Sequence, residues 1–110
     1  MEREINIGGK PYRLVANGAT PRIYRSFFPK QDIFRGMSNA VSSNGEILDS
    51  EVFENLTYVM AIQGGSVPTA KKIDDWLAEM ESPLAIIEAA PEVLELWAAE
   101  TETTSIGKKE

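Results

Sequence analysis

The sequence contains neither cysteine nor histidine. Without cysteine there is no disulfide framework and no thiolate nucleophile. Without histidine the chain lacks the usual general base near neutral pH and the commonest metal ligand. It also has no phosphate-binding GxxxxGK[ST] loop, no GxSxG nucleophile motif and no GxGxxG after a strand. We therefore predict that the protein is not an enzyme and has no catalytic residues, metal site or cofactor.

Long apolar runs are also missing. No stretch approaches the roughly 20 apolar residues needed to cross a bilayer. The first residues, Met1 to Glu4, do not combine a basic segment with an apolar one, so no signal peptide is visible. These features predict a cytoplasmic protein without a membrane partner.

Charge is abundant but uneven along the chain. The net charge is −6, yet residues 1–35 carry seven basic and three acidic groups, whereas residues 36–110 carry four basic and fourteen acidic groups. The acidic excess repels phosphate, so we expect no nucleic-acid partner. The asymmetry is compatible either with ion pairing inside the molecule or with attraction between copies. Together with a hairpin that needs cover, it leads us to predict a homo-oligomer.

The N-terminal residues predict a β-hairpin. Residues 2–7 end in a period-two alternation, and Gly8-Gly9 supplies the positive φ angles that a two-residue turn needs. Residues 10–16 form the returning strand, with Tyr12 and Leu14 on one face and Arg13 and Val15 on the other. Two strands alone are marginally stable, so the hairpin must lie on helices or be extended by another chain.

Beyond Asn17-Gly18 the pattern is helical. The predicted helices are one capped by Thr20 and ending at Pro29, one from Asp32 to about Val41, one over residues 50–63, one over 69–81, and one from Leu84 that Pro91 either kinks or restarts. Residues 42–45 form the most loop-like segment. The fold class is thus α+β: an N-terminal β-hairpin packed on a bundle of about five helices, with residues 1–100 as a single domain and 101–110 as a disordered tail.

Apolar residues at two places are candidates for contacting a partner protein: Phe27 and Phe28 in the first helix, and Leu94, Leu96 and Trp97 in the last. The alternative for each is a place in the core, because aromatic residues three and four apart usually face inward. Leu94 and Trp97 share a helix face from which Leu96 points away, so one of the three should be partly exposed.

The order of these motifs resembles a known family. Residues 5–14 read I-N-I-G-G-K-P-Y-R-L, residues 24–28 read Y-R-S-F-F, and residues 73–77 read I-D-D-W-L before a proline-containing last helix with L-E-L-W at 94–97. This series is similar to the tail assembly chaperones of long-tailed phages and prophages. The likeness covers about 100 residues; each motif is weak alone, and their order carries the resemblance.

The resemblance implies a function in the cytoplasm of a host bacterium. Such chaperones coat the apolar surface of the tape measure protein, a long helical chain, until tail-tube protein replaces them, and they are absent from the mature virion. A longer form made by ribosomal frameshifting is common in the family, and Gly107-Lys108-Lys109 is compatible with a slippery codon run.

Two other functions remain open from the sequence. One is a structural head–tail completion or connector protein that is retained in the phage particle. The other is an unrelated bacterial regulator that binds proteins through the same helices.

Overall fold

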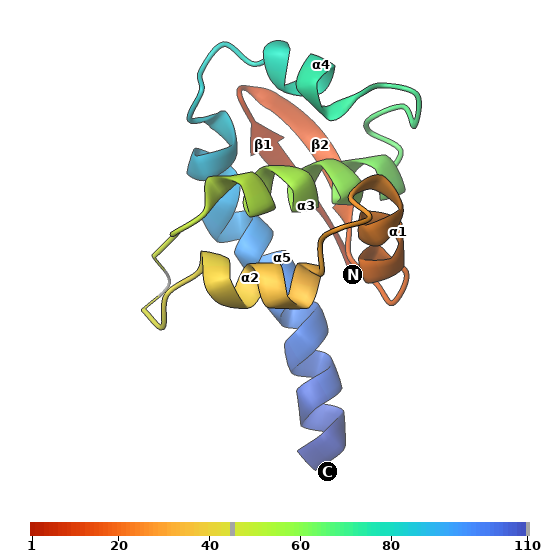
Figure 1. Cartoon of the computed structure of the whole chain (residues 1–110), viewed down its shortest axis with the longest axis vertical. Coiled ribbons are helices and arrows are strands. Elements are labelled where there is room, and N and C mark those ends of the chain that lie inside the picture. Colours follow the sequence, from red (N-terminus) through yellow and green to blue (C-terminus); the bar gives the residue numbers. More distant parts are fainter. Residues whose placement is uncertain (45, 110) are drawn as a thin grey trace.

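The computed structural model describes the backbone of residues 1–44 and 46–109 and the side chains up to residue 98, Gly45 excepted. A two-stranded antiparallel sheet precedes a series of helices, and the hairpin packs on them, which confirms the predicted α+β class (Figure 1). The elements are β1 (Glu2–Ile7), β2 (Lys10–Val15), α1 (Thr20–Phe27), α2 (Ile33–Ala40), α3 (Ser50–Gln63), α4 (Ile73–Ala78) and α5 (Ala85–Lys109).

The hairpin has the predicted turn and the predicted faces. Gly8 and Gly9 take φ angles of 61° and 87°, as a two-residue turn between right-twisted strands requires. The strands pair with Ile7 opposite Lys10. Their inner face buries four apolar side chains, while the opposite face is exposed except for Val15, which is half-buried. The buried residues are Ile5, Ile7, Tyr12 and Leu14.

Helix α3 is the centre of the molecule. Its bounds are the predicted ones, and the Asp49 side chain caps it by accepting a hydrogen bond from the Glu51 N–H. Helical spacing predicts that Asn55 lies with Glu51 and Glu54 on the polar face, opposite the apolar stripe. This is wrong for Asn55, which is only 5% exposed. Since α1, α2, α5 and β2 all contact α3, its sides are covered as well as its apolar stripe. Asn55 Nδ2 donates to Tyr24 Oη and Gln31 Oε1, which satisfies a polar group that burial would otherwise penalise.

Helix α1 begins differently from the prediction. Thr20 is its first residue and not its cap, because Ala19 occupies the cap position without a side-chain hydrogen bond. The Thr20 side chain is fully buried; its Oγ1 accepts from the Asn17 N–H and donates to Gln63 Oε1 at 2.6 Å. The hydroxyl therefore ties the start of α1 to the end of α3. By contrast, Asp32 caps α2 as predicted, accepting from the Phe34 N–H.

Helix α4 is shorter than the predicted helix over 69–81. The Lys71 N–H closes a turn onto the Pro68 carbonyl, and the Lys71 carbonyl accepts a hydrogen bond from the Tyr58 hydroxyl. These bonds hold residues 69–71 in a turn that cannot join the helix. Four apolar residues have helical spacing in this segment, and of these only Trp76 is fully buried, at 1% exposure. Ile73, Leu77 and Met80 are partly buried, and Met80 lies beyond the end of the helix.

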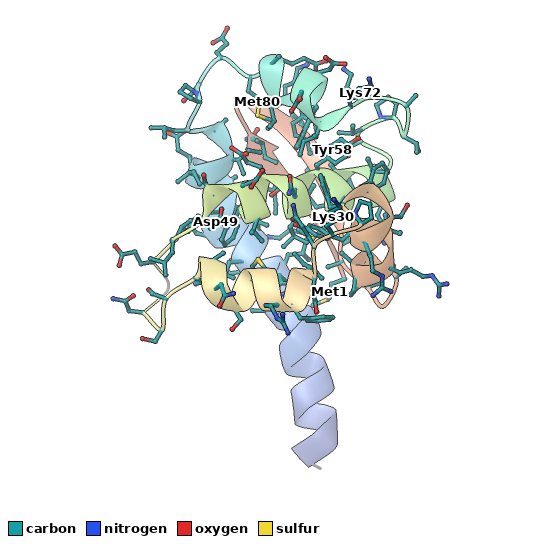
Figure 2. All side chains as sticks on the ribbon, in the orientation of Figure 1. Met1, Lys30, Asp49, Tyr58, Lys72 and Met80 are labelled. Atoms are coloured by element: carbon teal, nitrogen blue, oxygen red, sulfur yellow. The ribbon has the colours of Figure 1, made fainter. Side chains whose placement is uncertain are left out.

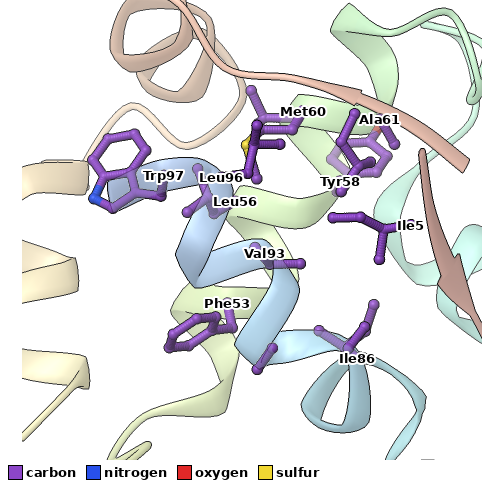
Figure 3. Close-up of a cluster of buried hydrophobic side chains, with 14 of the residues drawn as sticks. Ile5, Phe53, Leu56, Tyr58, Met60, Ala61, Ile86, Val93, Leu96 and Trp97 are labelled. Carbon is purple, nitrogen blue, oxygen red and sulfur yellow. The ribbon is translucent and has the colours of Figure 1, made fainter. Parts of the chain in front are cut away.

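Helix α5 passes through Pro91 without a break, so a new helix does not begin at this proline. Figure 3 shows Val93 and Leu96 of α5 beside Phe53 and Leu56 of α3. The backbone of residues 101–109, for which the sequence predicted disorder, continues this helix in the structure. Extending an existing helix needs no new nucleus, so a weakly helical sequence can follow a well-packed one. This last part projects from the body (Figure 1).

The loop predicted at 42–45 is closed by an isolated bridge between Val41 and Ile47, and Gly45 within it lies outside the described residues. No helix in the described part of the chain is both long and apolar enough to cross a membrane.

Candidate protein-binding site

The five residues predicted to contact a partner separate into three environments. Phe27 and Phe28 are half-buried and line a surface hollow. Leu94 is half-buried and lines a second hollow. Leu96 and Trp97 are 4% and 9% exposed and belong to the core. Of the three candidates in the last helix, Leu94 is therefore the partly exposed one. The prediction that Leu96 and Trp97 contact a partner is corrected, because both are core residues.

Helix α5 explains the burial of Leu96. The helix lies against β1 on one side and α3 on another, so more than one of its faces is covered. Leu96 consequently finds apolar neighbours although it points away from the face shared by Leu94 and Trp97. The Trp97 ring also stacks on Phe34 of α2, with centroids 5.6 Å apart.

The first hollow, which we call the aromatic hollow, has a volume of about 330 Å³. It lies between the end of α1, the middle of α3 and the segment leading into α4. Its walls include three aromatic side chains and one large aliphatic one: Phe27, Phe28, Tyr58 and Ile73. Phe27 packs edge-on against Tyr58 with ring centroids 5.5 Å apart, so the aromatic rings hold one another in place.

Tyr58 is held at the bottom of the aromatic hollow. Its hydroxyl donates to the Lys71 carbonyl, and its ring also packs on Trp76 at 5.9 Å. Burial raises the pKa of the Tyr58 hydroxyl, so the side chain stays neutral under physiological conditions. Figure 2 shows Tyr58 and Lys72 on the same side of the molecule, between α3 and α4.

Charged side chains form the rim of the aromatic hollow. Lys71 and Lys72 lie on it together with Asp74. Lys71 pairs with Glu79, and this hydrogen bond holds the pKa of the Glu79 carboxyl below its usual value. An apolar floor with a polar rim is the arrangement found where proteins bind an apolar side chain of a partner.

The second hollow, which we call the α5 hollow, has a volume of about 350 Å³. Leu94, Ala90 and Pro91 of α5 form one side, and Ile47 forms the other. Leu48, the neighbour of Ile47, is 63% exposed. Apolar surface is thus available here too, although the hollow contains no aromatic ring.

Sequence reasoning missed Tyr58, Ile73 and Ile47 as parts of these hollows. Tyr58 is an aromatic residue in the middle of the predicted helix over 50–63, and this was the only signal in the sequence that could have marked it. Ile73 has helical spacing with Trp76 and Met80, which favours a core position over a surface one. Only the fold brings residues 27, 58 and 73 together, because no local pattern connects them.

Among residues 1–98, where side chains are described, no group of three acidic residues is arranged to hold a metal ion. One buried polar atom of this part of the chain lacks a hydrogen-bond partner, the indole Nε1 of Trp76.

Comparisons with known proteins found no relatives. No family model, no curated protein and no solved structure matches the chain.

Proposed function

We propose that this protein is a chaperone for another protein chain, and specifically a tail assembly chaperone that keeps a phage tape measure protein in solution until tail-tube protein replaces it. The observation that carries the proposal is the aromatic hollow, which leaves Phe27 and Phe28 half-buried on the surface of a small domain. The ordered series of motifs that resembles tail assembly chaperones supports the identity of the partner.

The aromatic hollow suits an apolar side chain presented by a helix. A tape measure protein is a long helical chain, and an amphipathic helix offers apolar side chains three and four residues apart. One such side chain would enter between Phe27 and Ile73, and the charged rim would contact the polar flanks of the helix. Binding of this kind hides apolar surface that would otherwise drive the long chain to aggregate.

Co-expression with the candidate tape measure protein tests the proposal. The wild-type chain should keep the long protein in the soluble fraction. Ile73→Glu places a charge in the aromatic hollow at the first residue of α4, where a helix tolerates an acid. We expect this variant to stay folded by circular dichroism and to leave the long protein insoluble.

Leu84→Glu is the matched control, because Leu84 is an apolar residue that is 57% exposed and lines neither hollow. It should behave like the wild type. If Ile73→Glu also solubilises the partner fully, the aromatic hollow is not the contact surface. If the wild type never does so, the chaperone function is wrong.

A connector retained in the particle is the second function. Mass spectrometry of purified virions separates the two, because a chaperone should be absent from them and a connector present. A longer frameshifted product would be detected in infected cells by the same method.

A further inference from the structure

The outer edge of β1 carries backbone groups that are free to bind another strand. Met1 and Ala16 exchange two hydrogen bonds, at 2.7 and 2.8 Å, and so fix which residue pairs are bonded across the hairpin. Because bonded and non-bonded pairs alternate in an antiparallel ladder, the N–H and C=O groups of Glu2, Glu4 and Asn6 point away from β2. Among the described residues, these backbone groups have no hydrogen-bond partner.

The opposite edge of the hairpin is closed. The Arg13 N–H of β2 donates to Ser66 Oγ at 2.7 Å, and Ser66 Oγ donates to the Arg13 carbonyl at 2.9 Å. Pro11, two residues earlier, has no N–H to offer. The backbone of Gly64 also lies directly against Arg13. Strand addition to this hairpin is therefore possible only at β1.

A hollow of about 370 Å³ lies alongside the open edge. Asn6 and the Gly8-Gly9 turn form one side, and Ala85 and Ala89 of α5 form the other. Figure 1 shows β1 on the side of the hairpin that faces the first turns of α5. An extended segment pairing with β1 would thus lie over small alanine side chains, which leave room for it.

Acidic side chains surround this hollow. Glu81, Glu88 and Glu92 line it, and Glu4 extends from the edge strand itself. Two cations lie nearby, and both are already paired. Arg3 is 2.9 Å from Glu95 and 4.0 Å from Glu92 of α5, and Arg13, opposite Glu4 in the hairpin, is 2.7 Å from Glu2. An incoming strand would meet carboxylates on both of its faces, from α5 on one and from β1 on the other.

The charge also argues against a second copy of this chain as the third strand. Two β1 edges paired antiparallel about a two-fold axis at Arg3 or Glu4 would bring Glu2 close to Glu4 of the other copy, or Glu4 to Glu4. An axis at Ile5 avoids this but leaves Glu2 beside the turn of the other copy, without a strand partner. Like charges opposite each other destabilise a sheet. The edge therefore discriminates against itself and in favour of a cationic segment.

We propose that the β1 edge binds an extended, lysine- or arginine-containing segment of another protein, which pairs with Glu2–Ile7 as a third antiparallel strand. Main-chain hydrogen bonds to Glu4 and Asn6 hold the segment, and the carboxylates beside the hollow select its basic side chains. The inference does not rest on the tape measure proposal, because this surface shares no lining residue with the aromatic hollow.

The probe is a heptapeptide that alternates lysine with valine, and its control replaces each lysine by glutamate. We expect the lysine peptide to bind, with loss of affinity between 50 and 500 mM salt, and the glutamate peptide not to bind. In NMR spectra the amides of Glu4 and Asn6 should shift and become protected from hydrogen exchange. Replacing Glu88 and Glu92 by glutamine should weaken binding and flatten its salt dependence.

Two N-methylated peptides separate strand pairing from simple charge attraction. Methyl groups on the alternate amides that face β1 should weaken binding roughly fivefold or more, whereas methyl groups on the other amides should not. Glu4→Pro, which removes one outward N–H as Pro11 does on β2, should also weaken binding. Equal affinity for both methylated peptides overturns the proposal. The proposal is also overturned if neither peptide binds and the protein instead forms a dimer that Glu4→Pro abolishes.

Discussion

Gly64 follows α3 with its backbone pressed against β2. A Cβ atom built on it would lie 1.9 Å from the Arg13 carbonyl oxygen, far inside any van der Waals contact. Its own φ angle is −77°, which every residue adopts, so the requirement for glycine is purely one of space. In the sequence, the glycine pair 64–65 indicates only the end of the helix over 50–63. The contact of Gly64 with the hairpin depends on the tertiary fold.

We expect Gly64→Ala to destabilise the protein by about 1–3 kcal/mol or more, because the hairpin must move off α3 to make room. Urea denaturation followed by circular dichroism measures the change. Gly18→Ala is the control, since a Cβ at Gly18 would meet nothing within 4 Å. Equal stability of the two variants would show that α3 and β2 are not packed as closely as described.

Glu54 lies on α3 in a place that disfavours its charge. Burial raises the pKa of its carboxyl, and the carboxylates of Glu51 and Asp49 raise it further. The folded state therefore prefers the protonated acid. The resulting stability is present below the usual glutamate pKa and is lost as the pH rises through the folded value.

Glu54→Gln should accordingly raise the melting temperature at pH 7, by an amount corresponding to less than about 1 kcal/mol because the side chain is partly exposed. The gain should disappear near pH 3.5, where the acid is protonated in both states. Glu46→Gln, at an exposed acid, is the control. A gain that persists at low pH would point to packing and not to charge.

At the scale of elements, the orientation of α5 places two nearby leucines, Leu94 and Leu96, in different environments. Leu96 is 4% exposed and faces the core, whereas Leu94 is half-buried beside the α5 hollow. Leu96→Asp should cost more than about 3 kcal/mol or unfold the domain, because it buries a carboxylate without a partner. Leu94→Asp should retain most of the stability. Thermal melting distinguishes them, and similar melting temperatures would contradict the orientation of α5.

Local chemistry was enough to predict the hairpin and α3. The Gly8-Gly9 turn, the Asp32 cap and the helical periodicity act over a few residues, so the sequence displays them directly. The same holds for the α+β class as a whole.

The remaining errors concern contacts between distant segments. Asn55 is buried because α1 and the segment that follows it bring Tyr24 and Gln31 to it. Helix α4 is short because the Tyr58 hydroxyl donates to the Lys71 carbonyl. Of the candidate site, Phe27, Phe28 and Leu94 were predicted to offer partner contacts and do line hollows. Their binding role stays a prediction.

At the scale of the whole molecule, the charge asymmetry is only partly neutralised internally. Arg3, Arg13 and Lys71 form ion pairs. Other cations, on or near α1 and α2, are exposed and have no ion pair among the described residues: Arg22, Arg25, Lys30 and Arg35. The acidic groups on β1 and α5 lie on other elements than these cations, so the molecule has a basic region and an acidic region.

We therefore expect self-association through these two regions that weakens with salt, because exposed charges are screened beyond about 8–10 Å at physiological ionic strength. Light scattering at 50 and 500 mM salt on a concentrated sample tests this. A monomer under both conditions would contradict it, and an oligomer insensitive to salt would point to apolar contacts instead.

The difference between the two edges of the hairpin also limits how far strand addition can go. A growing fibre needs every molecule to accept one strand and to offer another. Here Ser66 and Pro11 prevent β2 from accepting a strand. Each molecule therefore has one edge, β1, at which a strand can be added, and the sheet cannot grow from molecule to molecule. A protein with one open edge can bind an added strand without seeding amyloid-like growth.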